Sequence, residues 1–119
     1  MSERPWLAAY PEGVPTEIDP SSYHSLVELM EQAFKAFAPR AAYSFMGKDS
    51  SFGEIDRQSQ SLANYFQSLG LQQGERIAIM MPNVTQYPVA VAAILRAGYV
   101  VVNVNPLYTA RELEHQLKD

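Results

Sequence analysis

The sequence predicts an α/β fold built on a small parallel sheet with flanking helices. Residues 77–81 are continuously apolar and residues 99–104 form a second apolar run, as expected of strands buried on both faces. The segment between them has the composition of a buried helix. A strand, a helix and a strand within about thirty residues make a βαβ unit, whose strands pair in parallel through a right-handed crossover. Because two strands do not complete a doubly wound sheet, we expect a partial sheet.

The composition is that of one small globular domain. The chain has 119 residues, of which 47% are hydrophobic and 18% charged, with a formal net charge of −4. Nine basic residues are scattered among thirteen acidic ones. Because phosphate binding needs concentrated positive charge, this pattern argues against a nucleic-acid partner.

The same sequence favours a soluble protein of the cytoplasm. It contains no cysteine, which excludes disulfides and thiolate chemistry and fits a reducing compartment. The N-terminus lacks the basic start and apolar run of a signal peptide. The most apolar stretch, residues 89–104, is interrupted by Arg96 and Gly98 and is too short to span a bilayer.

Residues 1–24 are predicted to form an extended arm that lies on a surface. Four of the eight prolines fall in this segment, and each restricts its own φ and biases the preceding residue away from helix. Its apolar side chains would need cover; they are Trp6, Leu7, Tyr10, Val14 and Ile18. We expect them to pack on the body of the same protein. The alternatives are a homodimer contact and a peripheral contact with a membrane surface.

Two amphipathic helices follow, with a short strand between them. Ser25 and Glu28 have capping-box spacing and open a predicted helix over residues 26–37, and residues 41–46 read as a strand. Residues 47–49 are predicted to form a turn that leads into a second short strand. Ser51 and Glu54 repeat the capping-box spacing, and the second helix ends before Gly70.

The last two predicted helices border the second parallel strand. The first covers residues 85–97, with Thr85 as its N-cap and Pro88 at a position that needs no backbone donor. The second starts from a third capping box, Thr109 with Glu112, and no further strand follows it. We therefore expect residues 25–119 to be an incomplete α/β subdomain of a larger fold.

Specific tracts of the sequence resemble the adenylate-forming acyl-CoA synthetases. They are RIAIMMPN at residues 76–83 and AAILRAGYVVVNVNPLYTARELEHQLKD at residues 92–119. The opening WLAAYPEGVPTEIDPSSYHSLVELMEQAF at residues 6–34 is similar to the N-terminal arm and first helix of bacterial long-chain fatty-acid–CoA ligases. The resemblance covers essentially the whole chain.

The resemblance implies a parent enzyme that makes acyl-CoA in two steps. A long-chain fatty acid and ATP with Mg²⁺ would give an acyl-adenylate and pyrophosphate, and CoA would then displace AMP. Such an enzyme would work in the cytoplasm or peripherally on the inner membrane. The six glycines here are isolated, and no phosphate-binding loop motif occurs. We therefore assign no catalytic residue and no metal ligand, and we expect this chain alone to hold neither ATP, Mg²⁺ nor CoA.

Three residues are candidates to face the substrate or CoA channel of the parent enzyme. Asn83 follows the first predicted parallel strand, and Asn105 and Tyr108 follow the second. In open α/β sheets, ligands gather beyond the carboxyl ends of the strands. The alternative is that Asn103 and Asn105 only satisfy backbone groups while Thr109 caps a helix.

The sequence therefore predicts the N-terminal segment of a long-chain fatty-acid–CoA ligase, inactive by itself. The alternative is a non-catalytic α/β module that binds a partner or associates with itself through an exposed sheet edge.

Overall fold

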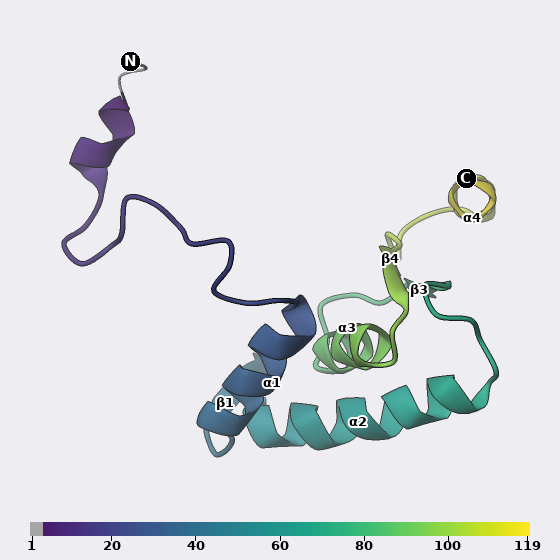
Figure 1. The fold of residues 1–119 in the computed structure, drawn as a ribbon. Helices are drawn as coiled ribbons and strands as arrows, with labels where there is room; N and C mark the ends of the chain where they lie inside the picture. Colours follow the sequence, from purple (N-terminus) through teal and green to yellow (C-terminus); the bar gives the residue numbers. More distant parts are fainter. Residues whose placement is uncertain (1–3) are drawn as a thin grey trace.

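The computed structural model describes residues 4–119 and confirms the α/β class (Figure 1). Three helices pack together, and two separate two-stranded sheets lie beside them. In chain order the elements are a 3₁₀ helix Pro5–Ala9, α1 Leu26–Ala36, β1 Ala41–Phe45, β2 Lys48–Ser51, α2 Phe52–Ser68, β3 Arg76–Ile79, α3 Gln86–Arg96, β4 Val100–Asn103 and α4 Ala110–Lys118. Within residues 4–119, no helix combines the length and apolar character needed to cross a membrane.

Three of the helices begin at the capping residues that the sequence predicts. The Ser51 hydroxyl accepts from the Glu54 backbone N–H, and the Glu54 carboxylate accepts from the Ser51 N–H, so the box is closed in both directions. At α1 the Ser25 hydroxyl caps Glu28 in the same way, but the Glu28 carboxylate reaches one residue further back, to the His24 N–H. Each cap satisfies helical N–H groups that have no partner within the helix.

The hairpin between α1 and α2 turns one residue earlier than predicted. Strands β1 and β2 are antiparallel with Phe45 opposite Lys48, which leaves only Met46 and Gly47 in the turn. Both turn residues have positive φ, 49° and 76°, as a two-residue hairpin with right-handed twist requires. Lys48 and Asp49, predicted as turn residues, instead belong to β2.

The predicted βαβ unit is present, and its strands are parallel. Ile77 of β3 pairs with Val101 of β4, and Ile79 pairs with Asn103. Helix α3 covers one face of this pair, where Ile79 packs with Ala90 and other α3 side chains. The opposite face stays exposed, so the prediction that these strands are buried on both faces is wrong for this chain.

Helix α3 is buried nearly all round, as predicted, but Thr85 does not cap it through its side chain. Thr85 already has helical dihedrals, and the Tyr87 N–H bonds to the Val84 carbonyl, so the helical turn begins earlier than the predicted cap. The buried α3 side chains are Val89, Ala90, Ala92, Ala93 and Ile94. Small residues on α3 allow α2 to approach closely, which places the α2–α3 contact at the centre of the core.

Arg96, near the end of α3, joins three helices. Its guanidinium bonds to the Asp56 carboxylate at 2.8 Å and to the Ser59 hydroxyl at 2.9 Å on α2, and to the Glu31 carboxylate at 3.2 Å on α1. It also lies 5.6 Å from the centre of the Phe34 ring. The arginine side chain is only 10% exposed, so these contacts replace most of its hydration.

The N-terminal segment runs away from the helices instead of lying on them (Figure 1). Residues Pro5–Ala9 form a 3₁₀ helix, which departs from the extended conformation expected throughout the arm. Arg4 pairs with Glu17 within the segment. Four of its five apolar side chains are exposed, namely Trp6, Tyr10, Val14 and Ile18, so they find no cover on this chain. The division between arm and body remains a prediction.

Candidate functional site

The candidate site lies beyond the carboxyl ends of β3 and β4, where the three predicted residues are found. Asn83 follows β3, and Asn105 and Tyr108 lie in the loop between β4 and α4. All three side chains are exposed. A parallel pair places both loops at one edge of the sheet, because the two strands end on the same side.

Asn103 at the end of β4 fixes the geometry of this edge. The Tyr87 hydroxyl of α3 donates to Asn103 Oδ1, and Gln116 Nε2 of α4 donates to the Asn103 carbonyl at 2.9 Å. These two bonds tie α3 and α4 to the same strand end. Sequence reasoning missed Tyr87 and Gln116, since no local pattern marks contacts across sixteen and thirteen residues.

Asn83 lines a hollow of about 270 Å³ at the start of α3. The opposite wall comes from β1 of the hairpin. The lining residues are Tyr43, Ser44, Phe45, Asn83, Val84, Thr85, Tyr87 and Pro88. Aromatic rings form much of this wall, while Asn83, Ser44 and Thr85 supply neutral hydrogen-bonding groups.

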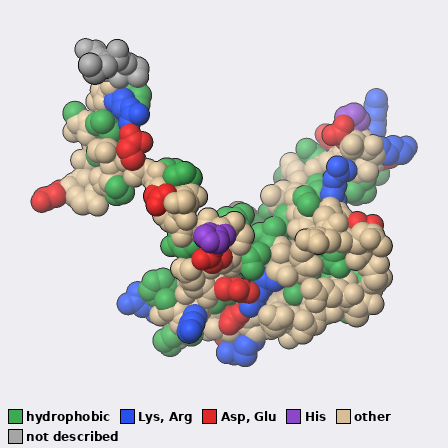
Figure 2. Space-filling view, viewed as in Figure 1, with side chains coloured by type: hydrophobic (Ala, Val, Ile, Leu, Met, Phe, Trp, Pro, Cys, Tyr) green, Lys and Arg blue, Asp and Glu red, His purple; other side chains and the backbone are tan. Residues whose placement is uncertain are grey.

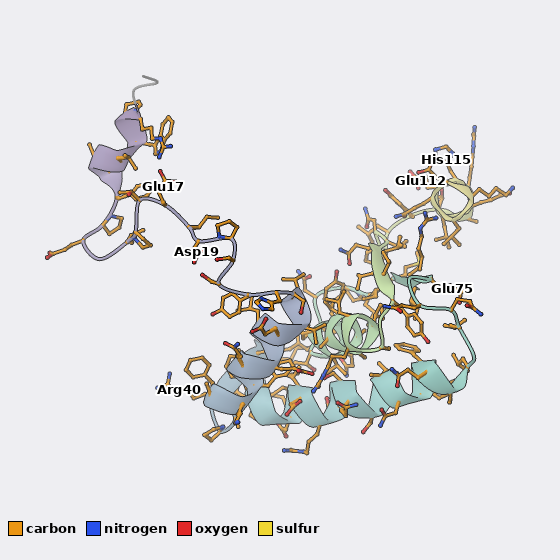
Figure 3. All side chains as sticks on the ribbon, in the orientation of Figure 1. Glu17, Asp19, Arg40, Glu75, Glu112 and His115 are labelled. Atoms are coloured by element: carbon orange, nitrogen blue, oxygen red, sulfur yellow. The ribbon has the colours of Figure 1, made fainter. Side chains whose placement is uncertain are left out.

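Asn105 and Tyr108 are placed differently from Asn83. Asn105 Oδ1 accepts from the Leu107 N–H at 3.0 Å, and the Asn105 carbonyl accepts from the Tyr108 N–H at 3.0 Å. The Asn105 side chain therefore stabilises its own turn. Tyr108 lines a second hollow, with α4 residues that include Glu112 and His115. Figure 3 labels the side chains of Glu112 and His115 on α4. The structure thus brings Asn83 and Tyr108 to the same end of the sheet but into different hollows.

Glu112 is the titratable group at this edge whose pKa is clearly perturbed. The Thr109 N–H donates to its carboxylate at 2.8 Å and the Thr109 hydroxyl at 2.9 Å, and these bonds hold the pKa of Glu112 below its ordinary value of 4.5. Hydrogen bonds to the charged form favour that form. The carboxylate is therefore committed to the cap of α4.

We expect this capping box to persist below pH 4.5 and to fail as the pH falls through the lowered pKa of Glu112. A carboxylate whose pKa is lowered by folding stabilises the folded state above its unfolded pKa and loses that contribution on protonation. Carboxyl NMR titration of Glu112 measures the pKa directly. Thr109→Ala should raise the pKa, whereas Thr109→Ser, which keeps the hydroxyl, should not. An unchanged pKa in Thr109→Ala would contradict the assignment.

The described residues around this edge supply neutral hydrogen-bonding groups, Asn83, Ser44 and Thr85 among them. Loops that bind a triphosphate present consecutive backbone amides. The glycines with positive φ in residues 4–119 are single residues, none of them adjacent to another; they are Gly13, Gly47, Gly70, Gly74 and Gly98. Acidic and basic side chains are interspersed on the face seen in Figure 2. Among residues 4–119, no cluster of three His, Cys, Asp or Glu side chains could hold a metal ion.

Curated relatives match nearly all of this chain. It is 52% identical over 118 residues to a long-chain-fatty-acid–CoA ligase of Yersinia pestis, covering 98% of this chain and 21% of that protein. It is 54% identical over 115 residues to the ligase of the same name in Escherichia coli O6:H1, covering 96% of this chain and 20% of that protein. The chain therefore spans about a fifth of these relatives' length, and it matches their N-terminal segment.

Solved structures share the fold. The N-terminal subdomain of NpsA from Klebsiella oxytoca, in complex with 3-hydroxyanthranilyl-AMSN, aligns with a TM-score of 0.75 at 22% identity, covering 79% of this chain and 24% of that one. The anthranilate CoA ligase AuaEII, in complex with anthranoyl-AMP, aligns with a TM-score of 0.74 at 20% identity, covering 80% and 18%.

A protein-family model also matches most of the chain. The model described as AMP-binding enzyme matches residues 30–119, which include all four α-helices wholly or in part and both sheets. The tracts that carry the resemblance to acyl-CoA synthetases lie largely inside this range. The chain belongs to the AMP-binding enzyme family.

Proposed function

We propose that this chain is the N-terminal segment of an AMP-forming long-chain fatty-acid–CoA ligase. The observation that carries the proposal is an identity of 52–54% to such ligases along nearly the whole chain. A self-association module is not favoured, because the match to ligases leaves almost no residues outside it.

The proposed parent enzyme joins a long-chain fatty acid to CoA through an acyl-adenylate. ATP, Mg²⁺ and CoA belong to that whole enzyme. This segment would supply scaffold, since its βαβ unit presents two loops at one end of the sheet. We propose that Asn83, Asn105 and Tyr108 line a wall of the acyl or CoA channel there.

We further propose that the parent enzyme works in the cytoplasm, in peripheral contact with the inner membrane, and as a homodimer. The exposed Trp6 and Tyr10 of the N-terminal arm support a contact with a membrane or with a second subunit, because aromatic residues are enriched at interfaces.

The isolated chain is expected to show no fatty-acid-dependent exchange of pyrophosphate into ATP, because its sequence contains no phosphate-binding loop motif. A chimeric ligase, in which this chain replaces the aligned segment of the Escherichia coli protein, should form palmitoyl-CoA within about tenfold of the parent rate. Both activities are measured on purified proteins.

Two results would contradict these expectations. Exchange above background by the isolated chain would refute the analysis of its site. A chimera that is folded by circular dichroism and calorimetry yet makes no acyl-CoA would refute the proposed function.

A further inference from the structure

One tyrosine of α3 contacts both parts of the candidate site. The Tyr87 side chain lines the hollow beside Asn83, and its hydroxyl donates a hydrogen bond to Asn103 Oδ1 at the end of β4. The loop from Asn105 to Tyr108 begins two residues after Asn103. Asn83 and Tyr108 line different hollows, so Tyr87 is a physical link between the two.

The hydrophobic core holds the Tyr87 ring in place. The Tyr87 N–H donates to the Val84 carbonyl at 3.0 Å, which fixes the backbone at the start of α3. The ring is half-buried and packs against the buried cluster in which α3 meets the sheet, Ile79, Ala90, Ile94 and Tyr99. A side chain whose rotamer is locked by packing presents its polar group at a defined position. The Tyr87 hydroxyl is therefore suited to orient a neighbour.

Asn103 is held through both its side chain and its backbone. The Tyr87 hydroxyl bonds to its side-chain oxygen, and Gln116 Nε2 of α4 donates to its carbonyl at 2.9 Å. The next residue, Val104, is buried, and its N–H donates to the Ile79 carbonyl at 2.9 Å. The loop that follows therefore starts from a strand end that three hydrogen bonds fix.

We infer that Tyr87 is a positioning residue of the ligase, which acts through Asn103 to place the Asn105–Tyr108 loop relative to the hollow beside Asn83. This inference rests on the proposed function, in which the two loops line a wall of the acyl or CoA channel. Such a wall contacts parts of the substrate that are remote from the reacting atoms, so it binds substrate and transition state alike. A misplaced wall should raise KM and leave kcat nearly unchanged.

The kinetic test uses Tyr87→Phe in the Escherichia coli chimera, because phenylalanine keeps the ring and removes only the hydroxyl. We expect the KM for palmitate or for CoA to rise about two- to tenfold, the effect of one lost hydrogen bond, with kcat within about twofold. The KM for ATP should not change, and the substrate whose KM rises identifies the channel. Tyr65→Phe is the control, since it makes the same change in a tyrosine that is 58% exposed on α2.

Variants of Asn103 separate positioning from a general loss of packing. Asn103→Ala should raise the same KM as Tyr87→Phe, and the double variant should be no worse than either, because both remove one hydrogen bond. Asn103→Asp keeps an acceptor oxygen for the Tyr87 hydroxyl and should retain a KM near that of the unsubstituted chimera. Unchanged KM values in Tyr87→Phe, or a fall in kcat alone, would overturn the inference.

A measurement on the 119-residue chain distinguishes this inference from the proposed function. Backbone ¹⁵N relaxation gives order parameters, which are about 0.85 for rigid backbone. In Tyr87→Phe we expect the order parameters of residues 105–108 to fall, whereas those at the start of α2 should not. Unchanged values in the loop would overturn the inference. A chimera that makes no acyl-CoA with Tyr87 present would refute the proposed function, and the fall in loop order would still support the positioning role.

Discussion

Replacing Arg96 with alanine is expected to lower the free energy of unfolding by about 3 kcal/mol. The guanidinium is the shared partner of Asp56 and Ser59 on α2 and of Glu31 on α1. Its removal leaves the fully buried Ser59 hydroxyl without that donor and also removes packing against the Phe34 ring. The loss stays below that of a fully buried ion pair because Asp56 and Glu31 are 41% and 51% exposed, so water can solvate them.

Urea denaturation followed by circular dichroism measures this loss. Arg96→Lys should retain part of the stability, because lysine keeps the charge but cannot bond to several partners at once with a planar fork. Arg57→Ala serves as the matched control, since Arg57 is exposed on the same helix as Asp56. Equal free energies of unfolding for Arg96→Ala and Arg57→Ala would show that the contacts of Arg96 with α1 and α2 contribute nothing to stability.

Replacing Ile94 with alanine is expected to cost about 3–4 kcal/mol. Ile94 is 1% exposed and packs with Ile79, Ala90 and Tyr99 where α3 covers the sheet. Truncation removes buried methyl and methylene groups and leaves a cavity that the two strands and the helix can fill only in part. Small domains have total free energies of unfolding of about 5–15 kcal/mol, so this loss is a large fraction of the total stability.

Thermal and urea unfolding of Ile94→Ala measure the cost, with Leu107→Ala as the control. Leu107 is 87% exposed in the loop after β4, so its truncation should change stability by less than about 0.5 kcal/mol. Indistinguishable unfolding midpoints for the two variants would mean that the contact between α3 and the sheet is not part of the hydrophobic core.

Much of the fold follows from local chemistry that the sequence displays. Helices α1, α2 and α4 begin at the predicted residues because a Ser or Thr hydroxyl accepts from the backbone N–H three positions on, and at α2 and α4 the Glu at that position bonds back to close the capping box. Gly70 and Gly98 follow the ends of α2 and α3 in the left-handed conformation that favours glycine. The parallel pairing of β3 and β4 follows from the helix between them.

The errors lie where the outcome depends on parts of the chain that meet only in space. The hairpin turn falls at Met46 and Gly47 because the cross-strand register pairs Phe45 with Lys48. Only the two residues between them remain unpaired. The strand composition of β3 suits burial on both faces, but within residues 4–119 helix α3 covers one face and the other stays open.

The candidate site also combines features that the sequence predicts with features that only the tertiary structure decides. The sequence by itself determined the α/β class, the order of the elements from α1 to α4, the caps of α1, α2 and α4, and the strand ends after which Asn83, Asn105 and Tyr108 stand. These features depend on periodicity and on contacts within a few residues. Only the tertiary structure decided that Tyr87 and Gln116 meet at Asn103, that Arg96 joins three helices and that one sheet face stays open. Those contacts link residues 13–65 positions apart, and their energies depend on distance and burial, which no local pattern encodes.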